Sequence, residues 1–189
     1  EIIFLDDKEV AVLTNDKVEV LDLNGKKVKK NITKIKWGAE QAEKSGFKHF
    51  MLKEIFEQPR SIRDCMRGRM YPELGKVQLG GIKEFANKLK NIDRIIIVAC
   101  GTSWHAGLVG EYLIEDYARI PVEVEYASEF RYRNPIITEK DVVIAISQSG
   151  ETADTMAAIE MAKDKGATIF GICNVAGASI PRISDAGVY

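Results

Sequence analysis

The chain has 189 residues, of which 46% are hydrophobic and 29% are charged, and its formal net charge at pH 7 is −1. This length fits one compact domain with an accessory segment, and so small a net charge gives no field that would attract nucleic acid or a membrane surface. No apolar run has the length of a membrane-spanning helix, and the first residues lack the basic start of a signal peptide.

In the first 36 residues, apolar residues alternate along short segments such as VAVL and VEVL, which are separated by turn-like stretches. The Asn24-Gly25 pair favours a tight hairpin because both positions tolerate positive φ. We therefore expect residues 1–36 to form a small antiparallel β segment that is too short to be stable alone. Residues 37–50 are polar and contain glycines, which is typical of a linker.

Residues 51–93 are predicted to be a helical segment that leads into the main domain. An apolar stripe extends from residue 52 to residue 66 and contains Pro59. Because proline has no N–H to donate, we expect one helix to end near Gln58 and a second to begin with Pro59 in its first turn. A further helix is predicted from a second apolar stripe: Ile82, Phe85, Ala86 and Leu89.

Residues 94–189 alternate between strand and helix patterns. Strands are expected at residues 95–99, 122–126, 142–146 and 168–173, helices at 104–117 and 152–165, a short helical turn within 175–184, and a fifth strand from 186 to 189. This alternation predicts right-handed crossovers and an α/β fold with a doubly wound parallel sheet.

Two loops rich in hydroxyl groups follow predicted strands. The letters CGTS come after residues 95–99, and SQSGET comes after residues 142–146. Both loops lead into helices, whose free N–H groups and positive dipole ends favour an anion. Hydrogen bonds to a charged group contribute about 1.5–3 kcal/mol each, whereas association costs about 4–15 kcal/mol. The loops therefore predict a metabolite of weak to moderate affinity, bound through a phosphate.

Either loop alone could equally consist of ordinary helix N-caps. No nucleotide-binding fingerprint competes, because neither G-x-x-x-x-G-K-[ST] nor G-x-G-x-x-G occurs in the chain. The cysteines, Cys65, Cys100 and Cys173, and the histidines, His49 and His105, do not have the spacing of a zinc site. We expect no metal, no cofactor and a reduced, cytoplasmic setting.

The motifs CGTS, ASEFRYR and SQSGETADT, in this order and spacing, resemble the sugar isomerase (SIS) domain, a flavodoxin-like fold. Together with HFMLKEIFEQP, they are similar to the isomerising glutamine–fructose-6-phosphate amidotransferases, also called glucosamine-6-phosphate synthases. The resemblance covers essentially the whole chain. It implies that residues 1–36 end a glutaminase domain and that residues 94–189 form a first SIS subdomain.

Enzymes of this family transfer the amide nitrogen of glutamine to fructose 6-phosphate and produce glucosamine 6-phosphate. The resemblance implies a cytoplasmic homodimer without a cofactor. It also implies that six residues contact the sugar phosphate: Thr102, Ser103, Ser147, Gln148, Ser149 and Thr152.

The resemblance assigns no catalytic residue to this chain. The family's glutaminase domain begins with a nucleophilic cysteine, whereas this chain begins with glutamate and resembles only the end of that domain. The isomerase acid and base groups are expected in a second subdomain after Tyr189. We expect the chain alone to be inactive. His105 and Glu151 lie near the loops but are interpreted as non-catalytic, and Cys100 is interpreted as lining the core.

The segment SEFRYRNP, which contains Glu129, Arg131 and Arg133, is predicted to be a solvated charged loop, with a subunit contact as the second interpretation. Two other functions remain open. One is a non-catalytic SIS sensor of sugar phosphates, which a basic helix-turn-helix should precede. The other is a structural domain whose serine-rich loops are only helix caps.

Overall fold

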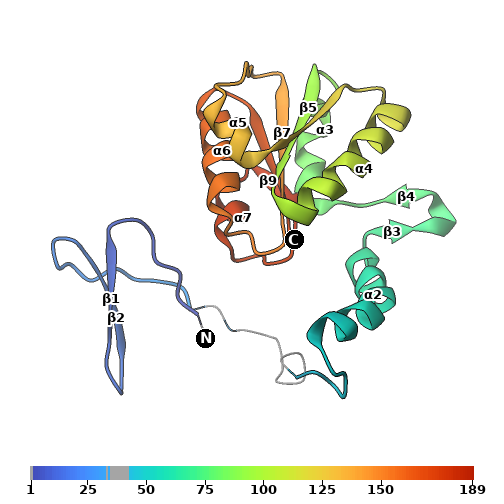
Figure 1. The fold of residues 1–189 in the computed structure, drawn as a ribbon. Coiled ribbons are helices and arrows are strands. Elements are labelled where there is room, and N and C mark those ends of the chain that lie inside the picture. The colour runs from blue at the N-terminus through green and yellow to red at the C-terminus, as the bar shows by residue number, and fades with distance from the viewer. Residues whose placement is uncertain (1, 33, 35–42) are drawn as a thin grey trace. The chain divides into compact units, whose positions relative to one another are not determined.

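The computed structural model describes residues 2–32, 34 and 43–189 (Figure 1). The chain divides into two units, Glu1–Cys65 and Met66–Tyr189. No helix in the described part of the chain combines the length and the hydropathy that a membrane crossing requires.

The first unit contains an antiparallel pair of strands, β1 (Glu9–Leu13) and β2 (Val18–Asp22). After β2 the chain turns through Gly25, and the carboxylate Oδ1 of Asp22 accepts hydrogen bonds from the N–H groups of Asn24 and Lys26, both at 2.9 Å. The predicted small β segment is confirmed. The last two residues of the predicted β segment, 35 and 36, and the first part of the predicted linker, residues 37–42, lie outside the described residues.

Helix α2 (Phe50–Met66) continues without interruption through Pro59. The predicted break at Gln58 is therefore wrong. Pro59 cannot donate to the carbonyl of Ile55, but a helix of 17 residues keeps its remaining hydrogen bonds when one is lost. The carbonyl of Pro59 also accepts a hydrogen bond from Nε of Arg63 at 3.1 Å.

The second unit begins with short elements. They are the antiparallel strands β3 (Met70–Tyr71) and β4 (Lys76–Val77), the 3-10 helices η1 (Pro72–Leu74) and η2 (Gly80–Phe85), and helix α3 (Ala86–Leu89). The helix predicted over residues 82–89 is thus a 3-10 segment followed by one α-helical turn. The β3–β4 pair was not predicted, because strands of two residues show no alternation.

A five-stranded parallel sheet forms the centre of the second unit, in the order β6-β5-β7-β8-β9. Its strands are β5 (Arg94–Ala99), β6 (Val122–Tyr126), β7 (Asp141–Ser147), β8 (Thr168–Cys173) and β9 (Ala186–Val188). Counted along the chain within this sheet, the order is 2-1-3-4-5, the doubly wound order of flavodoxin-like folds. The predicted fold class is confirmed.

Helices cover both faces of the sheet (Figure 1). Ile95 and Ile97 of β5 pack on the face of α4 (Gly101–Ala118), together with residues of η2 and α3. Ile96 and Val98 point to the opposite face, which carries three helices: α5 (Ala127–Tyr132), α6 (Ala153–Asp164) and α7 (Ser179–Ile183). This alternation explains why β5 is apolar at successive positions.

The first five residues of the segment predicted to be a solvated loop, 128–132, belong to helix α5, so that prediction is wrong for them. Phe130 is fully buried in the core and fixes the helix against the sheet. Two arginines that follow Phe130 have partners: Arg131 Nη1 lies 3.0 Å from Asp154 Oδ1, and Arg133 pairs with Glu125. A single buried aromatic residue therefore outweighs the polar composition of its neighbours.

Candidate phosphate site at the carboxyl edge of the sheet

The two loops rich in hydroxyl groups leave neighbouring strands at the same edge of the sheet. Strands β5 and β7 pair in parallel, with Ala99 opposite Ile146. These strands are also the point where the strand order reverses, which is where doubly wound sheets bind ligands. The predicted adjacency of the loops is confirmed, and their role in binding stays a prediction.

In the first loop, Gly101 opens α4 with φ +57. Thr102 is exposed and Ser103 is half-buried, and within the described residues neither side chain has a hydrogen-bond partner. The first turn of α4 also leaves backbone N–H groups unpaired, since Cys100 at the N-cap makes no side-chain hydrogen bond. Free donors of both kinds therefore gather at this helix end.

The second loop is held by its own hydroxyl groups. Ser147 is buried, and its Oγ accepts a hydrogen bond from the N–H of Gly150 at 3.0 Å and lies 3.2 Å from Oγ1 of Thr152. Oγ of Ser149 accepts from the N–H of Glu151 at 3.2 Å. Gln148 and Ser149 are exposed on the outside of the turn.

Helix capping does not account for these loops. Thr152 is the N-cap residue of α6, yet its side chain makes no capping hydrogen bond and turns to Ser147 instead. Gly150 has φ +69, and a Cβ added there would lie 2.5 Å from the Cβ of Ala178. The backbone of the turn thus has a conformation that only glycine accepts readily.

Side chains that could act as an acid, base or nucleophile near the loops are engaged otherwise. Nδ1 of His105 lies 3.0 Å from the carbonyl oxygen of Gly101. Oε1 of Glu151 accepts a hydrogen bond from the N–H of Ser179 at 2.8 Å. Burial raises the pKa of the Cys173 thiol, so this thiol stays protonated and weakly nucleophilic.

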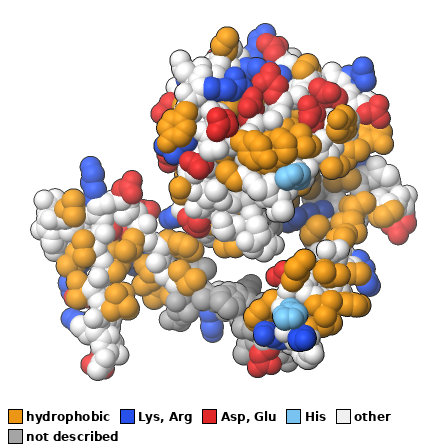
Figure 2. Space-filling model, viewed as in Figure 1, with side chains coloured by type: hydrophobic (Ala, Val, Ile, Leu, Met, Phe, Trp, Pro, Cys, Tyr) orange, Lys and Arg blue, Asp and Glu red, His pale blue; other side chains and the backbone are white. Residues whose placement is uncertain are grey.

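Sequence reasoning missed the chain segment after β8. Because β8 pairs with β7, this segment reaches the same sheet edge, and Ala178 and Ser179 contact the second loop. The predicted strands could have indicated this segment. If the strands predicted at 142–146 and 168–173 are neighbours in the parallel sheet, the chain after residue 173 must lie beside the second loop. In Figure 2, the lower end of the second unit shows a patch that is neither hydrophobic nor charged, next to a hydrophobic patch and a histidine.

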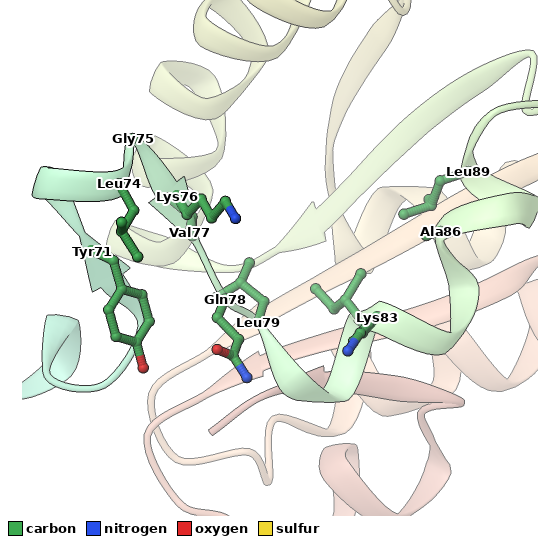
Figure 3. A pocket seen from close by; sticks show the side chains of 11 residues that line it. Tyr71, Leu74, Gly75, Lys76, Val77, Gln78, Leu79, Lys83, Ala86 and Leu89 are labelled. Carbon is green, nitrogen blue, oxygen red and sulfur yellow. The ribbon is translucent and has the colours of Figure 1, made fainter.

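A separate groove of about 1000 Å³ lies between the β3–β4 hairpin and the η2–α3 segment (Figure 3). Tyr71 and Leu74 line it from the hairpin, and Lys83 and Leu89 from the helical side. Its lining is mostly apolar and includes none of the six predicted site residues. The arrangement of donors, and not the size of a hollow, marks the carboxyl edge of the sheet as the candidate site.

Comparisons with known proteins agree with this fold. The family described as SIS domain matches residues 88–189. The C-terminal domain of glucosamine-fructose-6-phosphate aminotransferase from Francisella tularensis is a similar solved structure, with a TM-score of 0.70 and 40% identity. That likeness covers 77% of this chain and 40% of the solved one.

Curated relatives are named glutamine–fructose-6-phosphate aminotransferase (isomerizing). The protein from Chlorobaculum tepidum is 58% identical over 189 residues, and that from Bacteroides thetaiotaomicron is 57% identical over 190 aligned residues. Each match includes 100% of this chain, which spans 31% of the length of either relative. With the family match covering the sheet and both loops, the chain belongs to the SIS domain family.

Proposed function

We propose that the chain is the sugar-phosphate-binding part of an isomerising glutamine–fructose-6-phosphate aminotransferase, and that fructose 6-phosphate or glucosamine 6-phosphate is its ligand. The observation that carries the proposal is the adjacency of the two loops at the β5–β7 reversal point. The names of the relatives at 58% and 57% identity support the choice of ligand.

The phosphate would be held by neutral donors. We assign this role to the six residues predicted from the sequence: Thr102, Ser103, Ser147, Gln148, Ser149 and Thr152. The N–H groups at the starts of α4 and α6 would add backbone donors. A dianionic phosphate ester suits such a site, because hydrogen bonds to a charged acceptor are stronger than those to a neutral one.

We further propose that no residue of this chain performs the chemistry of the enzyme. The histidine and the glutamate next to the loops, His105 and Glu151, are engaged with backbone groups. In this proposal residues 1–36 end a glutaminase domain, and the chain forms a homodimer within the complete enzyme.

Calorimetric titration with glucosamine 6-phosphate tests the proposal, with glucosamine as the control that lacks the phosphate. We expect a dissociation constant between about 1 μM and 1 mM for the phosphate ester and no heat from glucosamine. The double variant S149A/T152A should give no heat with either compound while it remains folded. Binding of glucosamine 6-phosphate that the double variant retains would contradict the proposal.

A further inference from the structure

Glu151 connects the second loop to the next strand end. Its Oε1 accepts a hydrogen bond from the N–H of Ser179 at 2.8 Å. Ser179 is the first residue of α7 and follows β8, the strand beside β7. The side chain of Glu151 therefore joins chain segments at two neighbouring positions of the sheet edge.

Two further contacts connect the same segments. The N–H of Ile180 donates to the carbonyl of Gly150 at 2.9 Å, and Ala178 lies against Gly150 so closely that a Cβ on the glycine would overlap it. Ile180 is fully buried, so α7 is a fixed support. The backbone N–H of Glu151 also donates to Oγ of Ser149, so both the backbone and the side chain of Glu151 make hydrogen bonds.

The charge of Glu151 is unfavourable for the ligand that the loop is proposed to bind. A carboxylate beside a dianionic phosphate is repulsive, so the residue does not contribute to binding through its charge. Its contribution is that of a hydrogen-bond acceptor, a role that an uncharged amide oxygen also fulfils.

We propose that Glu151 is a positioning residue, whose hydrogen bond to the N–H of Ser179 holds Ser149 and Thr152 in the conformation that receives the phosphate. This inference rests on the proposed function. It distinguishes Glu151 from the hydroxyl residues, because it assigns Glu151 no contact with the ligand.

The test compares E151A with E151Q, and uses E160A as the matched control, because Glu160 is an exposed glutamate on α6, the helix that follows the second loop. Calorimetry with glucosamine 6-phosphate should show a dissociation constant about tenfold higher in E151A, as for the loss of one hydrogen bond to a charged group. E151Q should bind as tightly as the wild type or more tightly, and E160A should not differ from it.

Amide hydrogen exchange gives a readout that needs no ligand. The amides of Gly150, Thr152 and Ser179 should exchange faster in E151A than in E151Q or E160A, while the amides of β7 keep their protection. Equal exchange in all variants would overturn the inference, as would equal losses of affinity in E151A and E151Q. If the wild type does not bind the ligand, the proposed function fails, and the exchange measurement alone decides whether Glu151 positions the loop.

Discussion

Ala99 of β5 lies opposite Ile146 of β7 in parallel register, so the chain enters both loops from adjacent positions of the sheet. Every side chain of the six proposed contacts is neutral at pH 7. A phosphate site built from these residues would distinguish a phosphate ester from a free sugar through many directed donors and not through a salt bridge.

The hydroxyl of Thr152 provides a direct test of the binding role. We predict that T152V abolishes or strongly weakens the binding of glucosamine 6-phosphate, because it removes Oγ1 with little change in volume. Unfolding in urea should show a loss of about 0.5–1.5 kcal/mol, as for one hydrogen bond. T155V makes the same chemical change three residues further along α6, at a fully buried position, and should keep ligand binding. Equal binding by T152V and the wild type would contradict the assignment.

Glycine at position 150 is required for two reasons, a positive φ and the contact with Ala178. Gly101 has a positive φ but open space around it. We therefore predict that G101A costs about 1–2 kcal/mol of unfolding free energy, the price of a left-handed alanine. G150A should cost more, because overpacking adds about 1–3 kcal/mol. Urea unfolding of both variants checks this order, and a smaller loss for G150A than for G101A would show that the loop adapts easily.

Asp141 is 2% exposed and anchors the amino end of β7. Its Oδ1 accepts from Nε of Arg94 at 2.9 Å, and its Oδ2 accepts from the N–H of Thr138 at 2.6 Å. Burial raises the pKa of the Asp141 carboxyl, but the hydrogen bonds from Arg94 and Thr138 outweigh burial and hold the pKa below its ordinary value of 3.8.

A lowered pKa means that the unfolded chain binds the proton more tightly than the folded protein does. The stability that Asp141 contributes is therefore complete above about pH 5 and is lost as the pH falls through about 4 toward the folded-state pKa. We predict that D141N costs about 3 kcal/mol at pH 7, because Arg94 loses a buried partner. The difference from the wild type should narrow at pH 3.

The matched control is E123Q, since Glu123 also pairs with Arg94, at 2.7 Å, but its side chain is 43% exposed. E123Q should lose about 0–1 kcal/mol of unfolding free energy relative to the wild type. Urea unfolding of the three proteins at both pH values checks these expectations. A difference between D141N and the wild type that does not change with pH would contradict the account.

Pro59 leaves the carbonyl of Ile55 without its helical donor. We predict that P59A stabilises α2 by up to about 3 kcal/mol, because it restores this hydrogen bond and removes a steric clash. Slower amide exchange in residues 55–63 is the measurement, and Q58A serves as the control at a neighbouring exposed position. Unchanged exchange in P59A would indicate that the helix tolerates the proline without cost.

The central strands of the sheet could be predicted from the sequence because they are buried on both faces. Apolar runs identified β8 at its observed bounds, and β5 and β7 within one residue at each end. The edge strand β6, in which valine alternates with glutamate, was also predicted at its observed bounds. The position of the two loops could be predicted from these strands, because a parallel sheet brings the carboxyl ends of its strands to one edge.

The parts that could not be predicted depend on contacts between distant residues. Phe130 holds α5 against the sheet because it belongs to the buried core cluster, which includes residues of β5, β7 and β8. The charged residues around it in the sequence do not indicate this. In the same way, the partner of Glu151 lies 28 positions further along the chain and becomes its neighbour only through the pairing of β7 with β8.

The most direct test of the shared site is a titration of the ¹⁵N-labelled chain with glucosamine 6-phosphate, followed by the amide signals of both loops. We predict that Thr102 and Ser103 shift together with residues 148–152, and that all follow one dissociation constant. Shifts in only one loop, separate dissociation constants, or no shifts in either loop would contradict a single phosphate site between β5 and β7.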